Sequence, residues 1–319
     1  MSLQRSVSLL ASLATAAAVF TVVPAGTVTA APTQSDVSGV LCETDEGSAA
    51  RVRPGEEHAG ERNEMTAKQA AAAEKDFQAR LAARKASAGP DLGIQAVTTI
   101  PVVFHVVYAT NGTGNVTNTQ INQQIAEMNQ DFAGGESSQA SNTEFQFTLQ
   151  TVRRWQNNSW FNDPDSASGE AAMKSATHEG DAGVLNIWST NTSYLGYATF
   201  PSSYAQDPEL DGVVMQYGSM PGGSITNFNL GKTASHETGH WLGLYHTFQG
   251  GCSSTNDRVA DTPAQRTSTE GCPEGKNTCP ATGVDPIHNY MDYSYDSCYN
   301  QFTPGQTTRM KSQWAAYRA

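Results

Sequence analysis

The sequence predicts a mixed α/β fold of the α+β kind, with a strongly twisted mixed sheet in its N-terminal part and a loop-rich subdomain after it. Two observations predict this fold. Runs of β-branched and aromatic residues alternate with helix-periodic runs up to a helix expected to begin at about Thr233. After His246, Gly, Pro, Ser and Cys dominate until a last helix. Strands and helices mixed in this order are expected to pack around one shared sheet.

The first elements follow from local patterns. A buried strand is expected at Ile100–Tyr108, where β-branched and aromatic residues follow one another. A helix is expected over 117–132, because Ile121, Ile125, Met128 and Phe132 recur at helical spacing and Thr117 or Asn118 can cap it. Further strands are expected at 144–151, 183–189, 195–200 and 213–217.

The last helix is expected over Pro304–Tyr317, with Thr303 as its cap and Pro304 as its first residue. Met310, Trp314 and Tyr317 give this helix an apolar stripe, which indicates a core contact.

The first 97 residues differ from the rest. Arg5 precedes an apolar run over 7–23, and small residues precede Ala31, which together predict a signal peptide over 1–30 and an exported, extracellular protein. Residues 31–97 are interpreted as a pro-segment that acts as the chain's own inhibitor and is removed on maturation; a small helical domain or a spacer is the alternative. The catalytic domain would then span 98–319.

The composition of the chain limits the classes of binding partner that are expected. The chain has 319 residues and a formal net charge of −12, which argues against nucleic acid or an anionic membrane as a partner. After the signal peptide, no apolar run is long enough to span a bilayer. The oligomeric state is not predicted.

Residues 236–246 read His-Glu-Thr-Gly-His-Trp-Leu-Gly-Leu-Tyr-His. His236 and His240 share one face of a helix and can bind one metal ion together. Gly243 allows a sharp turn that returns His246 as third ligand. Three imidazoles leave an open position on a tetrahedral zinc ion, as in catalytic sites. Glu237 lies about 100° around the helix from His236, so it is expected to act on water as general base and acid and not as a ligand.

A second motif, Asn289-Tyr290-Met291-Asp292-Tyr293, follows about fifty residues later. It resembles the Met-turn of metzincins. With 261–263, 271–273 and 302–306, the two motifs resemble the pappalysin family of zinc endopeptidases in its smaller secreted microbial branch. The resemblance implies a metzincin-like fold, a protein or peptide substrate, and Met291 as an apolar floor below the histidines. It also implies that Tyr293 stabilises the oxyanion; a core tyrosine is the alternative.

Four of the five cysteines surround these motifs, and in an exported protein they suggest two disulfides with three possible pairings. A second zinc site is the rival interpretation, although no C-x-x-C pair supports it. The pappalysin resemblance implies the pairs Cys252–Cys279 and Cys272–Cys298.

The resemblance also implies two further sites. Asp296 is expected in the wall of the pocket after the scissile bond, where an acid favours Arg or Lys; a surface aspartate is the alternative. Asp257 and Thr262 are expected as ligands of a calcium ion, which prefers oxygen ligands on flexible loops. A solvated acidic loop is the alternative there.

The fifth cysteine, Cys42, lies in the pro-segment and is hypothesised to occupy the open zinc position and keep the precursor silent. An incidental free thiol is the alternative. Two non-enzymatic functions remain as rivals: a silent peptide-binding protein with a structural zinc, and a closed zinc site for which Cys42 is the one obvious fourth ligand.

Overall fold

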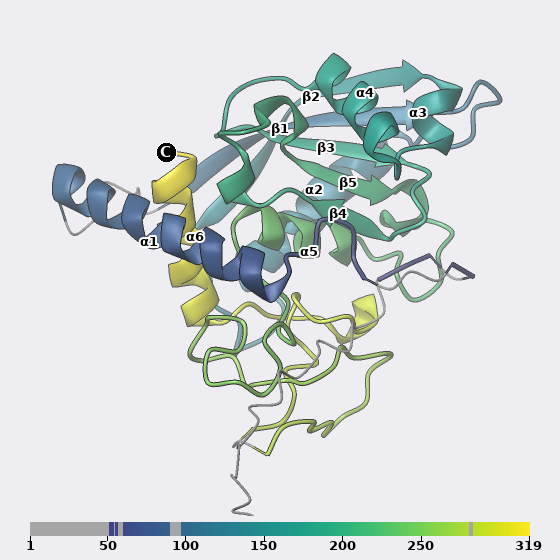
Figure 1. Ribbon diagram of the computed structural model, residues 1–319. Helices are drawn as coiled ribbons and strands as arrows, with labels where there is room; N and C mark the ends of the chain where they lie inside the picture. Colours follow the sequence, from purple (N-terminus) through teal and green to yellow (C-terminus); the bar gives the residue numbers. More distant parts are fainter. Residues whose placement is uncertain (1–50, 54, 57–59, 90–96, 281–282) are drawn as a thin grey trace, which may run out of the picture. The chain divides into compact units, whose positions relative to one another are not determined.

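The computed structural model describes residues 51–319 except 54, 57–59, 90–96 and 281–282 (Figure 1). The predicted signal peptide and Cys42 therefore lie outside the described residues. Among the helices that the structure describes, none combines the length and the apolar character needed to cross a membrane.

A five-stranded mixed sheet, with strand order β2-β1-β3-β5-β4, forms the N-terminal part and confirms the predicted sheet (Figure 1). The strands are β1 (Thr98–Tyr108), β2 (Phe145–Gln156), β3 (Leu185–Thr190), β4 (Gly196–Ala198) and β5 (Val213–Gln216). All neighbours pair in parallel except β4, which lies antiparallel to β5 at one edge. This edge faces the helix that carries the metal motif.

Three helices accompany the sheet before that motif. The helix α2 (Asn118–Phe132) is the predicted one, and Thr117 caps it reciprocally with Gln120. The helices α3 (Asn158–Asn162) and α4 (Ala167–Thr177) were not predicted. Both are short and lack a clear apolar stripe, and only their capping residues, Asn157 and Ser166, mark them in the sequence.

The motif helix α5 (Lys232–Trp241) is buried along its whole length beneath the sheet edge. Its first residue, Lys232, forms ion pairs with Glu127, Asp131 and Glu136 at 2.6–2.7 Å. These contacts fix the start of α5 against α2, so the two histidines of the helix have a rigid base.

The C-terminal part consists of loops and the helix α6 (Pro304–Tyr317), whose bounds match the prediction. Thr303 caps α6 reciprocally with Gln306, and Asp261 accepts hydrogen bonds from Thr303 Oγ1 and from the backbone N–H of Gly305. Disulfides join Cys252 to Cys279 and Cys272 to Cys298, the pairing that the family resemblance implies. The loops thus depend on covalent links more than on regular structure.

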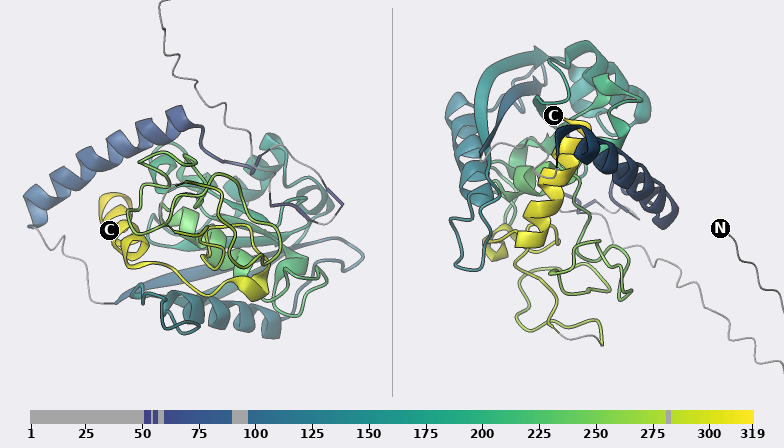
Figure 2. Two further views of the ribbon diagram at one scale, coloured as in Figure 1. Left: turned by 90° about the horizontal axis from the view of Figure 1, so that it is seen from below. Right: turned by 90° about the vertical axis from the view of Figure 1, so that its left-hand side faces the viewer.

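The helix α1 (Ala67–Ala88) belongs to the predicted pro-segment and packs along α6 (Figure 2). Phe77 and Leu81 of α1 are buried with Ala315 of α6, and the partly buried Tyr317 packs against them. The expectation that this segment has little core of its own fits these contacts, because its apolar residues are buried on another helix.

Candidate active site

The three predicted metal ligands converge at one point. His236 and His240 lie one turn apart on α5, and Gly243, with a φ of 92°, reverses the chain so that His246 returns to them. The Nε2 atom of His240 lies 3.2 Å from that of His236 and 2.9 Å from that of His246. All three side chains are buried.

The outer ring nitrogens of two histidines are held by backbone carbonyls. His236 Nδ1 donates to Tyr290 O at 2.6 Å, and His240 Nδ1 donates to Leu244 O at 2.8 Å. A proton fixed on Nδ1 leaves Nε2 with a free lone pair, as a metal ligand requires. The loop that contains Tyr290 therefore orients the ring of His236 directly.

The residues fit a zinc ion. Ligand atoms 2.0–2.1 Å from a tetrahedral zinc lie about 3.3 Å from one another, close to the separations of these Nε2 atoms. Neutral imidazoles are also ligands that suit zinc. The three histidines therefore form one face of a tetrahedral site.

Glu237 lies beside this face with a buried carboxylate, and neither of its oxygens has a hydrogen-bond partner among the described residues. Burial raises the pKa of Glu237 well above its ordinary value. Gly196 of β4 makes room for it, because a Cβ atom at that position would lie 2.7 Å from Glu237 Cγ. An unpaired buried carboxylate next to an edge strand suits proton transfer to and from a bound substrate.

The Met-turn lies below the histidines. Met291 is fully buried, and a Cβ atom on Gly239 of α5 would lie 2.4 Å from its sulfur. The glycine inside the motif thus lets the helix rest on the methionine. The ring of Tyr293 lies 4.8 Å from the ring of His246 and 5.8 Å from that of His236, and burial raises its pKa.

Sequence reasoning missed a fourth group at the histidines. Glu61, in the predicted pro-segment, places Oε2 2.7 Å from His246 Nε2 and 3.6 Å from His240 Nε2. Its other carboxylate oxygen lies 4.0 Å from His236 Nε2. Cys42 was the one fourth ligand considered from the sequence. Glu61 was overlooked because no local motif marks a glutamate that reaches the site across 175 residues of chain.

The same segment reaches the predicted specificity residue. Asp296 is buried and forms an ion pair with Arg51 at 3.0 Å, and it also accepts from the backbone N–H of Leu230. Arg51 and Arg53 also form backbone hydrogen bonds with Leu195 and Ser193, so the segment extends along the chain that leads into β4.

The predicted calcium ligands are buried as well. Asp257 Oδ2 and Thr262 Oγ1 have no hydrogen-bond partner among the described residues. Burial raises the pKa of Asp257 to about 7. Both side chains are thus withdrawn from solvent, unlike those of a solvated acidic loop.

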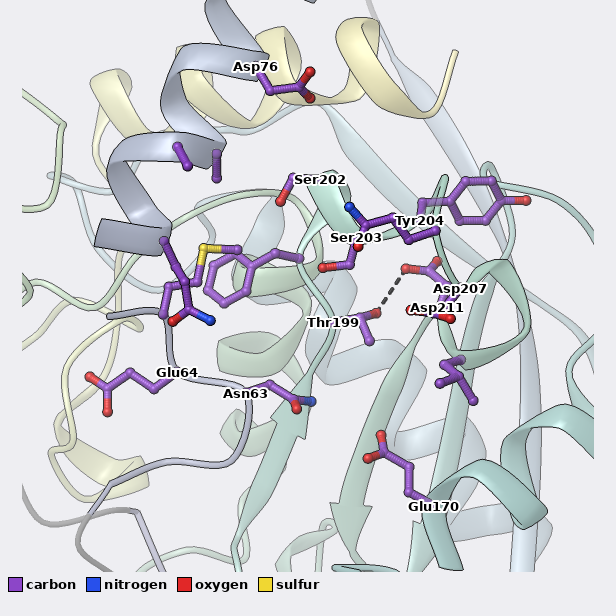
Figure 3. A pocket seen from close by; sticks show the side chains of 17 residues that line it. Asn63, Glu64, Asp76, Glu170, Thr199, Ser202, Ser203, Tyr204, Asp207 and Asp211 are labelled. Atoms are coloured by element: carbon purple, nitrogen blue, oxygen red, sulfur yellow. Dashed lines mark hydrogen bonds between the residues drawn. The ribbon is translucent and has the colours of Figure 1, made fainter. Parts of the chain in front are cut away.

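A cavity of about 560 Å³ opens between the α1 segment and the body of the chain (Figure 3). Asn63, Glu64 and Asp76 line one side, and Thr199, Ser203 and Asp207 are among the residues on the other. Two of its lining residues also contact the histidines, Glu64 at His246 and Phe200 at His240, but no histidine lines the cavity itself.

A mixed sheet, a buried helix with three converging imidazoles, a free glutamate and a Met-turn define a metal-dependent peptidase of the metzincin type. The family model described as pregnancy-associated plasma protein-A, peptidase family M43, matches residues 183–315. The chain belongs to this pappalysin family of zinc metalloendopeptidases, as its relatives establish.

Curated relatives include an extracellular metalloprotease of Neurospora crassa, 47% identical over 233 residues that make up 70% of this chain and 78% of the relative. An extracellular metalloprotease of Verticillium alfalfae is 46% identical over 239 residues, which make up 72% of this chain and 80% of the relative.

Among solved structures, a mutant of promirolysin from Tannerella forsythia is similar, with a TM-score of 0.66 and 29% identity, over 78% of this chain and 89% of that one. Mature mirolysin from the same organism, in complex with a cleaved peptide, matches with a TM-score of 0.60 and 31% identity, over 70% of this chain and 97% of that one.

Proposed function

We propose that the chain is exported as a precursor and that residues 98–319 hydrolyse peptide bonds with a zinc ion held by His236, His240 and His246. This proposal rests on one observation: the Nε2 atoms of the three histidines converge beside the buried carboxylate of Glu237, whose oxygens have no hydrogen-bond partner among the described residues. The extracellular relatives support export.

A zinc ion in this site would polarise the scissile carbonyl and lower the pKa of a water molecule from about 16 to roughly 7. Glu237 accepts the proton of the attacking water and then gives it to the leaving amine. The hydroxyl of Tyr293 donates a hydrogen bond to the oxygen of the tetrahedral intermediate, where negative charge develops. Met291 contributes only packing beneath the ligands.

The substrate is a peptide in extended form that pairs with the edge strand β4. The pairing of Arg51 and Arg53 with residues 193–195 supports this, since a segment of the chain already lies along that edge. Asp296 selects Arg or Lys after the scissile bond, and its buried ion pair with Arg51 supports a pocket that accepts a guanidinium group.

Residues 31–97 are a pro-segment that inhibits the precursor. Promirolysin matches a larger share of this chain than mature mirolysin does, 78% against 70%, which supports an added N-terminal part of this kind. The stretch from Arg51 to Glu61 reaches both the histidines and Asp296, which supports inhibition.

Asp257 and Thr262 are ligands of a calcium ion that stabilises the loop between α5 and α6. Their buried and unpaired oxygens support this assignment.

The function is tested with a library of internally quenched peptides. The matured chain is expected to cleave the library, whereas its Glu237→Ala variant and the matured chain with a zinc chelator are expected to be inactive. Retained zinc without any cleavage by the matured chain would favour a silent peptide-binding protein instead.

A further inference from the structure

Glu61 lies where a fourth ligand of the metal would lie. Its carboxylate oxygens are 2.7–4.0 Å from the three Nε2 atoms, and its side chain is almost wholly buried. The oxygen Oε1 has no hydrogen-bond partner among the described residues. Glu61 and the three histidines thus each offer one ligand atom within 4.8 Å of the others, and four ligands are the number that a tetrahedral zinc ion takes.

The turn around Glu61 is fixed from several directions. Arg62 donates to Glu170 Oε2 and to Asp165 O, and its guanidinium lies over the ring of Tyr197. On the other side of the turn, Met65 O accepts from Gln249 Nε2 at 3.0 Å. Because Arg62 and Met65, one and four residues after Glu61, are both anchored to the body, the carboxylate of Glu61 is held at the histidines.

The charges of the site also require a cation. Glu61 and Glu237 are both buried, and each has at least one oxygen without a hydrogen bond. Buried carboxylate oxygens without hydrogen bonds are unfavourable, and two carboxylates in one site repel each other. A divalent ion bound between Glu61 and the imidazoles compensates both charges.

We propose that Glu61 is the fourth ligand of the metal in the precursor and that it blocks the position at which the attacking water binds. The proposal rests on the proposed function, because it takes the metal and the later removal of residues 31–97 from it. Arg51 on the same segment fills the Asp296 pocket, so one stretch of chain closes both the metal and the specificity pocket.

The test uses the full-length precursor loaded with Co²⁺, in a Glu237→Ala background that prevents self-cleavage. The absorption spectrum of Co²⁺ reports its ligands, and azide serves as an external probe for an open position. We expect azide to leave the spectrum of this precursor unchanged. With Glu61→Gln or Glu61→Ala added, we expect azide to bind at least 10-fold more tightly.

Glu56→Gln is the matched control, because it removes the same charge from a partly exposed glutamate of the same segment, and it is expected to behave like the parent precursor. Equal Co²⁺ content and near-ultraviolet circular dichroism verify that the variants fold. Azide binding that is unchanged in both Glu61 variants would overturn the proposal. So would azide binding that appears only in Cys42→Ala, together with a lost thiolate-to-cobalt band.

A second readout separates this proposal from the proposed function. The intact Glu61→Gln precursor, with Glu237 restored, is expected to cleave a quenched peptide at least 10-fold faster than the parent precursor does. Once matured, both are expected to have the same kcat/KM. An inactive mature enzyme would contradict the proposed function, whereas an active mature enzyme with an equally silent Glu61→Gln precursor would contradict only the role of Glu61.

Discussion

At the scale of single residues, glycines shape the site as much as its ligands do. Gly239 lets α5 rest on the sulfur of Met291, and Gly243 gives the left-handed turn that returns His246. The role of Gly243 could be predicted from the motif, because its spacing demands a turn after the second histidine. The match between Gly239 and Met291 could not, since it depends on a contact between residues 52 positions apart.

Asp296 is expected to set the preference for basic residues. In the matured Asp296→Asn variant, kcat/KM for peptides with Arg after the scissile bond should fall at least 10-fold, because a buried guanidinium loses its counter-charge. Peptides with Leu in that position should be affected much less. The measurement compares the two peptides, with Asp207→Asn as a control for general loss of surface charge. An equal loss for both peptides would contradict the assignment.

At the scale of elements, most of the secondary structure could be predicted. The periodicity and the capping residues predicted α2 and α6 within one residue of their bounds. The edge strand was expected over 195–200 but β4 contains only Gly196–Ala198, because the chain before it pairs with residues 51–53 outside the sheet. Neither α3 nor α4 was predicted, since short helices without an apolar stripe leave only a cap as a signal.

Gly196 allows the edge strand β4 to lie close to the side chain of Glu237. In Gly196→Ala, the new Cβ atom would lie 2.7 Å from Glu237 Cγ and 2.8 Å from its Oε1, so the carboxylate must move. We expect kcat to fall at least 10-fold with unchanged zinc content, and the free energy of unfolding to fall by about 1–3 kcal/mol. Gly135→Ala is the control, because its nearest neighbours lie at 3.5 Å. Full activity in Gly196→Ala would mean that Glu237 is not constrained by β4.

At the scale of the whole molecule, the sequence predicted which part of the chain binds metal but not what covers it. The motif gave the ligands because helical geometry relates residues four apart. The contacts of Arg51 and Glu61 join residues up to 245 positions apart, and nothing local indicates them. The Glu61 contact therefore required the three-dimensional structure.

Acid is expected to destabilise the chain through His105. Its Nδ1 accepts from Trp155 Nε1 and its Nε2 donates to Asn186 Oδ1, so the ring is held neutral, and burial lowers its pKa to about 4. Between pH 6.5 and 4 the unfolded chain takes up a proton that the folded chain does not. Stability is therefore complete above pH 6.5 and falls by about 3 kcal/mol as the pH approaches 4.

Urea denaturation at pH 7 and pH 4.5 measures this effect. The difference between the two free energies of unfolding should be smaller in His105→Gln than in the parent, whatever the variant costs at pH 7. An unchanged difference would show that His105 does not contribute to the pH dependence.

Calcium is expected to stabilise the loops between α5 and α6. Added Ca²⁺ should raise the melting temperature of the parent, because it binds the folded loop and not the unfolded chain. In Asp257→Ala this increase should be lost. Asp285→Ala is a suitable control, since its carboxylate is already hydrogen-bonded to Thr278. A parent whose melting temperature does not respond to Ca²⁺ would rule out the site.

The cavity of Figure 3 has walls from two parts of the chain that separate if residues 31–97 are removed on maturation. In that case the cavity exists only in the precursor. A small molecule that fills it therefore binds the precursor and not the mature enzyme, and by mass action it holds the two parts together. Inhibitors of that kind would act by delaying the appearance of the enzyme, without competing with substrate for the metal.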